Sequence, residues 1–130
     1  MTADPIFHAT IDPTRNLLRA RFTGQMSAEE MKVAAEQMET LLPTLTPGFT
    51  MLADFSQVSS MDLDCVPHLT RLMDLHRAHK IGLVVRVLPP PESDIGINIL
   101  SVVPYRGEVK TMTAETLEEA EQVVRRLDQT

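Results

Sequence analysis

The first part of the chain has a pattern of apolar and polar positions that predicts a β-hairpin. Two apolar-rich runs, Ile6 to Ile11 and Leu17 to Phe22, are joined by turn-forming residues that include Pro13 and Asn16. Alternate positions of the second run are apolar, and two of the positions between them are arginines, which is typical of a strand with one buried face. We therefore expect an antiparallel hairpin near a sheet edge, with Gly24 ending its second strand.

The next segments predict a helix, a buried strand and a second helix. Ser27 and Glu30 have the spacing of a capping box, and apolar residues then recur every three or four positions as far as Leu42. Phe49 to Phe55 is a short apolar run without Gly or Pro, which favours a strand covered on both faces. After an acidic corner, a second amphipathic helix follows, and we expect Asp64 to be its N-cap.

The last third of the chain predicts two more strands and two more helices. The expected elements are a buried strand from Ile81 to Leu88, a short apolar helix from Asp94 to Val103, a strand from Glu108 to Met112, and a closing helix that opens at Thr113 or Thr116. The whole order, β-β-α-β-α-β-α-β-α, predicts one α/β domain over residues 1–130. Its sheet should be mixed and mostly parallel, with about five strands, an N-terminal hairpin and about four helices.

Composition narrows the possible partners and the compartment. The net charge of −6, the pI near 5.1 and the aromatic content of 4% disfavour nucleic acid, which needs a concentrated basic face or stacking platforms. No apolar run approaches the roughly 18 to 20 residues that span a bilayer, and the first five residues lack the features of a signal peptide. Cys65 is the only cysteine, which excludes an internal disulfide. We expect a cytoplasmic protein with no membrane span and no nucleic-acid partner.

Several side chains near the middle of the chain are candidates for chemistry. Asp54, Asp62 and Asp64 could supply carboxylates for a metal ion, and His68, His76 and His79 could supply further ligands. Cys65 could be a nucleophile with His68 as a nearby base. Simpler roles explain each group: the carboxylates bond backbone or cap a helix, the histidines are surface or half-buried residues, and a catalytic base normally comes from elsewhere in the fold. We expect no metal site, no cofactor and no catalytic residue, and therefore no enzyme.

The segment Asp54 to Asp62, with the sequence DFSQVSSMD, resembles a motif of the STAS domain, the module of bacterial anti-sigma-factor antagonists and of anion-transporter tails. In that family a strand ends in a D-hydrophobic-S-x-V-x-x-x-D pattern, which Asp54, Ser56, Val58 and Asp62 match. The family's regulatory phosphoserine directly follows the second Asp, and here that position is Leu63, which has no hydroxyl to accept a phosphate. A related group, the SpoIIAA-like proteins, shares the fold without the phosphoserine and is sometimes associated with small apolar ligands.

The resemblance implies a STAS/SpoIIAA-like domain that acts as a non-enzymatic regulatory module without the usual phosphorylation switch. It would bind a protein partner, such as a kinase, an anti-sigma-like protein or a sensor, through Ser59, Ser60, Asp62, Leu63, Asp64 and His68. In the alternative, a small apolar or lipid-like ligand lies under the 94–103 segment and contacts Met73, Ile95, Ile99, Leu100 and Val103. The Arg-bearing edge of the hairpin could pair with another copy, so a homodimer stays open.

Overall fold

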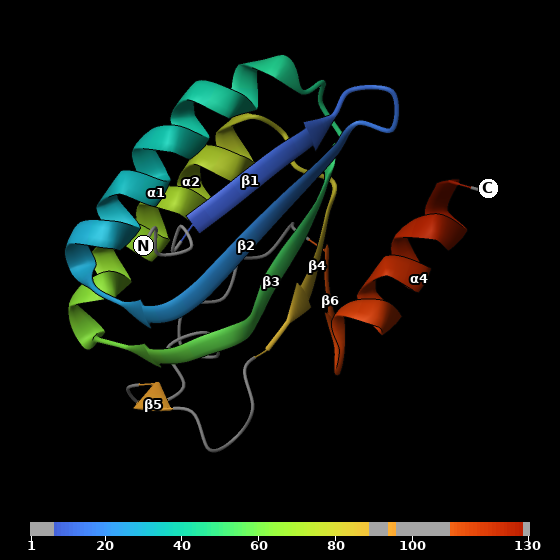
Figure 1. Ribbon diagram of the computed structural model, residues 1–130. Coiled ribbons are helices and arrows are strands. Elements are labelled where there is room, and N and C mark those ends of the chain that lie inside the picture. The colour runs from blue at the N-terminus through green and yellow to red at the C-terminus, as the bar shows by residue number, and fades with distance from the viewer. Residues whose placement is uncertain (1–6, 89–93, 96–109, 129–130) are drawn as a thin grey trace, which may run out of the picture.

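A computed structural model describes residues 7–88, 94–95 and 110–128, and in this part of the chain helices cover both faces of one sheet (Figure 1). The strands are β1 (Phe7–Asp12), β2 (Leu17–Met26), β3 (Thr50–Met61), β4 (Leu83–Val87), β5 (Asp94–Ile95) and β6 (Lys110–Ala114). The helices are α1 (Ala28–Leu41), α2 (Val66–Ala78) and α4 (Leu117–Asp128), with the short 3₁₀ turns η1 (Leu42–Thr44) and η2 (Leu63–Cys65).

The sheet has the mixed, mostly parallel topology that the sequence predicts. Its strand order is β1-β2-β3-β4-β6, and the two-residue strand β5 pairs with the end of β3. Only the β1–β2 pair is antiparallel among these pairings, which confirms the N-terminal hairpin. The described residues contain three α-helices where we expected about four in the whole chain. None of these helices is both long enough and apolar enough to cross a membrane.

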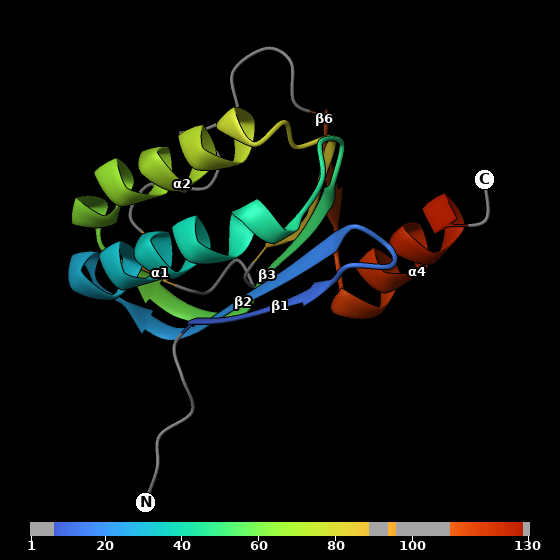
Figure 2. The same ribbon diagram turned by 90° about the horizontal axis from the view of Figure 1, so that it is seen from above.

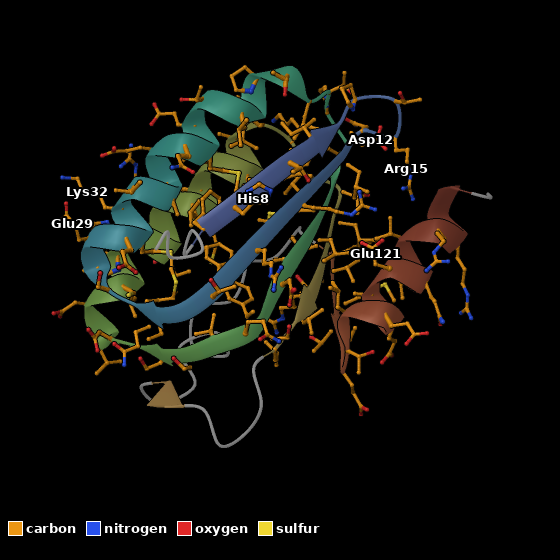
Figure 3. All side chains as sticks on the ribbon, in the orientation of Figure 1. His8, Asp12, Arg15, Glu29, Lys32 and Glu121 are labelled. Carbon is orange, nitrogen blue, oxygen red and sulfur yellow. The ribbon has the colours of Figure 1, made fainter. Side chains whose placement is uncertain are left out.

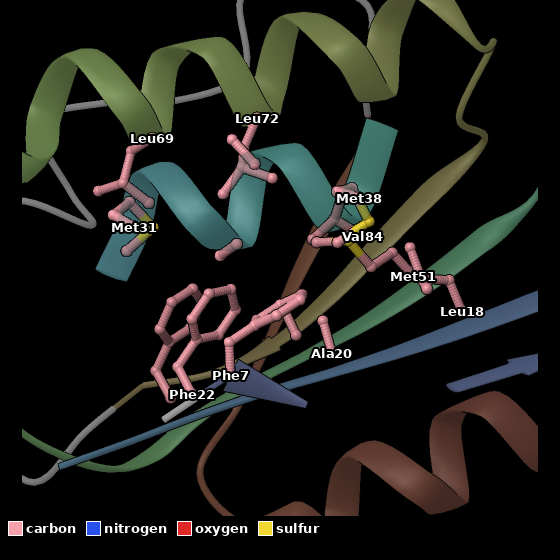
Figure 4. Close-up of a cluster of buried hydrophobic side chains, with 14 of the residues drawn as sticks. Phe7, Leu18, Ala20, Phe22, Met31, Met38, Met51, Leu69, Leu72 and Val84 are labelled. Carbon is pink, nitrogen blue, oxygen red and sulfur yellow. The ribbon is translucent and has the colours of Figure 1, made fainter. Parts of the chain in front are cut away.

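Two apolar cores hold the helices to the sheet. Helices α1 and α2 lie on one face, where Met31 and Leu69 belong to a large buried cluster with residues of β1, β2, β3 and β4 (Figure 2, Figure 4). Helix α4 lies on the other face, where Ala120 and Val124 pack against buried residues of β2, β3, β4 and β6. Because both faces of β3 and β4 are covered, these strands carry the nearly continuous apolar runs that the sequence shows.

Strands β2 and β3 are both longer than the sequence pattern predicts. Strand β2 continues through Gly24, whose φ is +76°, and β3 continues beyond Phe55 to Met61. Two register shifts between these strands mark places where β3 has one residue more than β2, which is the signature of a bulge. The predicted strand ends at Gly24 and Phe55 are therefore wrong, because the bulges let polar residues enter the strand while Val58 and Met61 stay buried.

Three predicted boundaries are also corrected. Asp64 is not the N-cap of α2, because residues 63–65 form the turn η2, which the Cys65 N–H closes by donating to the Asp62 carbonyl at 2.9 Å. Asp94 does not open a helix, because residues 94–95 form β5 beside the end of β3, and residues 96–103 lie outside the described residues. The closing helix is capped by Thr116 and not by Thr113, since the Thr116 hydroxyl accepts from the Glu119 N–H at 3.1 Å.

Gly82 lies just before β4 and close to the backbone that leads into β3, and it yields the first testable prediction. Its N–H donates to the Phe49 carbonyl at 2.8 Å, and a Cβ atom at this position would meet the Gly48 carbonyl oxygen at 2.7 Å. Backbone atoms cannot rotate away as a side chain does, so Gly82→Ala should lower the free energy of unfolding by about 1 to 3 kcal/mol. Urea denaturation measures this loss, and a variant as stable as the wild type would contradict the close approach.

Candidate functional site

The candidate site lies at the carboxyl ends of β2 and β3, where α1 and η2 begin (Figure 1). We call residues Ser59 to Asp64 the β3–α2 corner. Two contacts tie the corner and the next residue, Cys65, to the end of β2: the Met26 carbonyl accepts from the Asp62 N–H at 3.4 Å and from the Cys65 thiol at 3.4 Å. The carboxyl ends of parallel strands are the usual location of binding sites in open α/β sheets. The corner is thus fixed on a rigid part of the fold.

The corner presents an apolar side chain between two carboxylates. The Leu63 side chain is 55% exposed, and Asp62 and Asp64 on either side of it are exposed as well. A large aliphatic side chain that is more than half exposed in a rigid turn is available to a partner without rearrangement of the fold. The three residues at the tip of the corner therefore form the part of the predicted site that the structure exposes most.

The other predicted partner-binding residues lie beside this tip. Ser59 is exposed and Ser60 is half-buried, and both belong to the last part of β3 and not to a loop. His68 is half-buried in the first turn of α2, just beyond η2. The fold therefore brings the six predicted residues to one end of the sheet, and their role in binding stays a prediction.

Negative charge is concentrated around the buried Cys65. Burial is the main cause that raises the pKa of this thiol, and the charges of Asp62, Asp64 and Glu30 raise it further, against a backbone hydrogen bond from Asp62 that lowers it. A raised pKa keeps the thiol protonated, which disfavours a nucleophilic role. Glu30 is the one member of this acidic group that sequence reasoning did not place at the corner, because its position depends on the packing of α1 against η2.

Asp54 and Ser56, which match the motif, have a structural role in β3. The buried Asp54 carboxylate accepts from the Ser56 N–H at 2.9 Å and from the Ser56 hydroxyl at 2.6 Å through the same oxygen, Oδ1. This local bond lies at the first register shift between β2 and β3. It gives the Ser56 N–H an acceptor where the regular hydrogen bonding between β2 and β3 is interrupted. The D-x-S part of the pattern thus shapes the strand that leads to the corner.

The three histidines of the second helix do not form one site. His76 is buried, and burial, with a smaller effect of the nearby His79 charge, lowers its pKa to about 4. His68 lies in the first turn of α2, and His79 follows the last. Within the described residues no group of three or more His, Cys, Asp or Glu side chains could hold a metal ion.

Most of the residues predicted for an apolar ligand cannot be placed. Met73 is half-buried on α2, and Ile95 belongs to β5 beside the end of β3. Ile99, Leu100 and Val103 lie outside the described residues. The structure therefore leaves the ligand-binding alternative as a prediction.

Comparison with known structures identifies the fold class as a SpoIIAA-like α/β domain. One similar structure is that of the anti-sigma factor antagonist SpoIIAA in its unphosphorylated form, with a TM-score of 0.62, 19% sequence identity, and coverage of 95% of this chain and 99% of that chain. Another is an uncharacterized protein with a SpoIIAA-like fold from Shewanella loihica PV-4, with a TM-score of 0.66, 15% identity, and coverage of 95% and 98%. No protein-family model and no curated protein matches the sequence. The likeness confirms the predicted fold.

Proposed function

We propose that the chain is a non-enzymatic regulatory module that binds a protein partner through the β3–α2 corner. The observation that carries the proposal is Leu63, which is 55% exposed between two exposed carboxylates at the carboxyl end of the sheet. The similarity in fold to an anti-sigma factor antagonist supports this class of function, and a kinase, an anti-sigma-like protein or a sensor is the kind of partner that such a module would bind.

The proposed module binds without the usual serine switch after the second Asp. In the motif that the sequence resembles, the position after the second Asp carries a phosphorylatable hydroxyl, and here Leu63 fills it. An aliphatic side chain cannot gain or lose charge, so the surface at this position has the same chemistry at all times.

A comparison of captured proteins tests the proposal. Leu63→Arg and Asp62→Arg place a cation in the centre of the proposed interface, and each should weaken partner binding by about thirtyfold, the loss expected for a binding hot spot. The measurement is quantitative mass spectrometry of proteins that the immobilised wild type and variants recover from lysate of the source cells. Circular dichroism should be unchanged, because both side chains are exposed.

Leu117→Arg is the matched control. Leu117 is also a partly exposed leucine at a helix start, but it belongs to α4 on the opposite face of the sheet. A partner that binds the corner is recovered by the wild type and by Leu117→Arg and is lost with both corner variants. Equal recovery by all four proteins would refute the corner as the binding surface.

A further inference from the structure

Strand β1 forms one edge of the described sheet, and not the Arg-bearing strand β2 that the sequence pattern predicts there, because β2 lies between β1 and β3. It pairs along its whole length with β2, and the described residues place no other strand beside it. Figure 1 and Figure 2 show it as the outermost strand of the sheet. An edge strand presents unpaired backbone N–H and C=O groups, which are a template for pairing with another strand.

The side chains of β1 do little to prevent such pairing. Its sequence, FHATID, contains no lysine, arginine or proline, the residues with which edge strands usually resist association. At the opposite edge of the sheet, β6 begins with the exposed Lys110. On β1 itself Ala9 and Ile11 are only partly buried against the core below α1 and α2, so apolar surface is left at this edge.

We propose that β1 pairs with β1 of a second copy of this chain, antiparallel and with Thr10 of both copies on the two-fold axis. The two-fold axis of an antiparallel pair is perpendicular to the sheet and keeps the α1–α2 face of both copies on the same side. In such a pair, two directly opposed side chains point to the same face of the joined sheet. The two-fold axis must therefore pass where a residue faces the same residue of the second copy, and not between two positions. The centre at Thr10 is the one that pairs all residues from His8 to Asp12.

Charge and shape support this register. It sets the exposed His8 opposite Asp12 of the second copy, twice by symmetry, and it sets Ala9 opposite Ile11. Figure 3 shows where His8 and Asp12 lie on β1 of one copy. Asp12 is held at the end of β1, because its Oδ1 accepts from the Arg15 N–H at 3.3 Å. Cross-strand pairs of an imidazole with a carboxylate and of two apolar side chains are both favourable. A centre at Ala9 or Ile11 would lose the His8–Asp12 pairs.

The dimer leaves the β3–α2 corner free. The corner lies at the carboxyl ends of β2 and β3, which are the second and third strands of the sheet when β1 is counted as the first. Because the two-fold axis reverses the strand direction, the two corners of the dimer lie at opposite ends of the joined sheet. The dimer thus has two separate corners, and its existence does not depend on the function proposed for them.

Disulfide trapping tests both the edge and the register. Directly opposed residues of antiparallel strands have Cα atoms about 4.5 to 5.5 Å apart, within the range that a disulfide bridges. Thr10→Cys should therefore give a covalent dimer on mild oxidation, seen by non-reducing electrophoresis. Cys65 does not interfere, because it is buried. Met112→Cys, at the centre of β6, is the matched control at the opposite edge and should give no covalent dimer. A monomeric Thr10→Cys, or trapping through Met112→Cys instead, would overturn the proposal.

A second pair of variants tests the charge pairing without a cross-link. His8→Asp places a carboxylate opposite Asp12 in two symmetric places, and it should raise the dimer dissociation constant about tenfold. His8→Lys restores an attractive pair, and its dimer should be no weaker than that of the wild type. Both changes are at an exposed position, so folding is preserved. Analytical ultracentrifugation measures the two constants, and equal effects of the two variants would overturn the proposed register.

Discussion

Phe22→Ala is expected to lower the free energy of unfolding by about 3 to 5 kcal/mol, the usual cost of removing a buried aromatic ring. Phe22 is 2% exposed in the middle of β2, where it joins the two neighbouring strands through its ring (Figure 4). Its centroid lies 4.7 Å from that of Phe55 in a stacked pair and 5.0 Å from that of Phe7 in a tilted pair. A small domain has only about 5 to 15 kcal/mol in total, so this loss is a large fraction of its stability.

Two control variants separate the effect of the ring from that of volume and of exposure. Phe22→Leu keeps most of the apolar volume and loses the ring contacts, and it should cost about 1 to 2 kcal/mol. Leu63→Ala removes an aliphatic side chain that is already in water, and it should change stability by less than about 0.5 kcal/mol. Urea denaturation with an unchanged m-value measures all three. A loss below about 1 kcal/mol for Phe22→Ala would show that the ring is not packed as described.

Local patterns in the sequence are sufficient to predict most of the elements. The alternation along Leu17 to Phe22 gives β2 its buried and exposed faces, and the three- and four-residue spacing after Ser27 gives α1 its buried stripe. The Ser27 hydroxyl accepts from the Glu30 N–H at 3.3 Å, which confirms that half of the predicted capping box. These features depend on residues close together in the chain, so they can be read without knowledge of tertiary contacts.

The second half of β3 could not be predicted, because it depends on a partner strand. Four of its last six residues are polar, and a polar run after an apolar one is typical of a loop. Pairing with β2 and β5 keeps this run in the sheet, and the bond from Ser56 to Asp54 supports the bulge that the pairing requires. The same limit applies to the site. The sequence placed Asp62, Leu63 and Asp64 together, and only the packing of α1 added Glu30.

The extension of β3 also supports the proposal that the corner is a recognition surface. A loop after Phe55 would let Ser59, Ser60 and Asp62 converge on a substrate, whereas residues of a strand point alternately to opposite faces. The second bulge is at Ser59, whose side chain is exposed, while Val58 before it and Met61 after it are buried, so the polar residues of this segment lie between side chains that hold the strand in the core. The exposed group that remains at the tip is the aliphatic Leu63 between two carboxylates.

Stability should fall as the pH is lowered through the range in which an ordinary histidine becomes charged. His76 has an ordinary pKa of 6.5 in the unfolded chain and a pKa of about 4 in the folded protein, because burial disfavours its charged form. A lowered pKa means that the unfolded chain binds the proton more tightly than the folded protein does. The contribution of the neutral His76 to the free energy of unfolding is therefore complete above pH 6.5 and is lost between pH 6.5 and 4. The expected loss is about 2 kcal/mol between pH 7 and pH 5, and about 3 kcal/mol by pH 4.

Denaturation by urea at a series of pH values measures this dependence, and two variants assign it. His76→Leu removes the titrating group and keeps an apolar side chain in the buried position, so its stability should be nearly independent of pH between 7 and 5. His79→Gln, at the half-buried end of the same helix, should keep most of the dependence. Glu121 also has a lowered pKa, caused mainly by its hydrogen bond with Arg19. Its contribution to the free energy of unfolding is lost only at lower pH, as the pH falls below the ordinary carboxyl pKa of 4.5. A wild-type stability that is flat from pH 7 to pH 5 would mean that His76 is not buried in its neutral form, and the packing of α2 against the sheet would need revision.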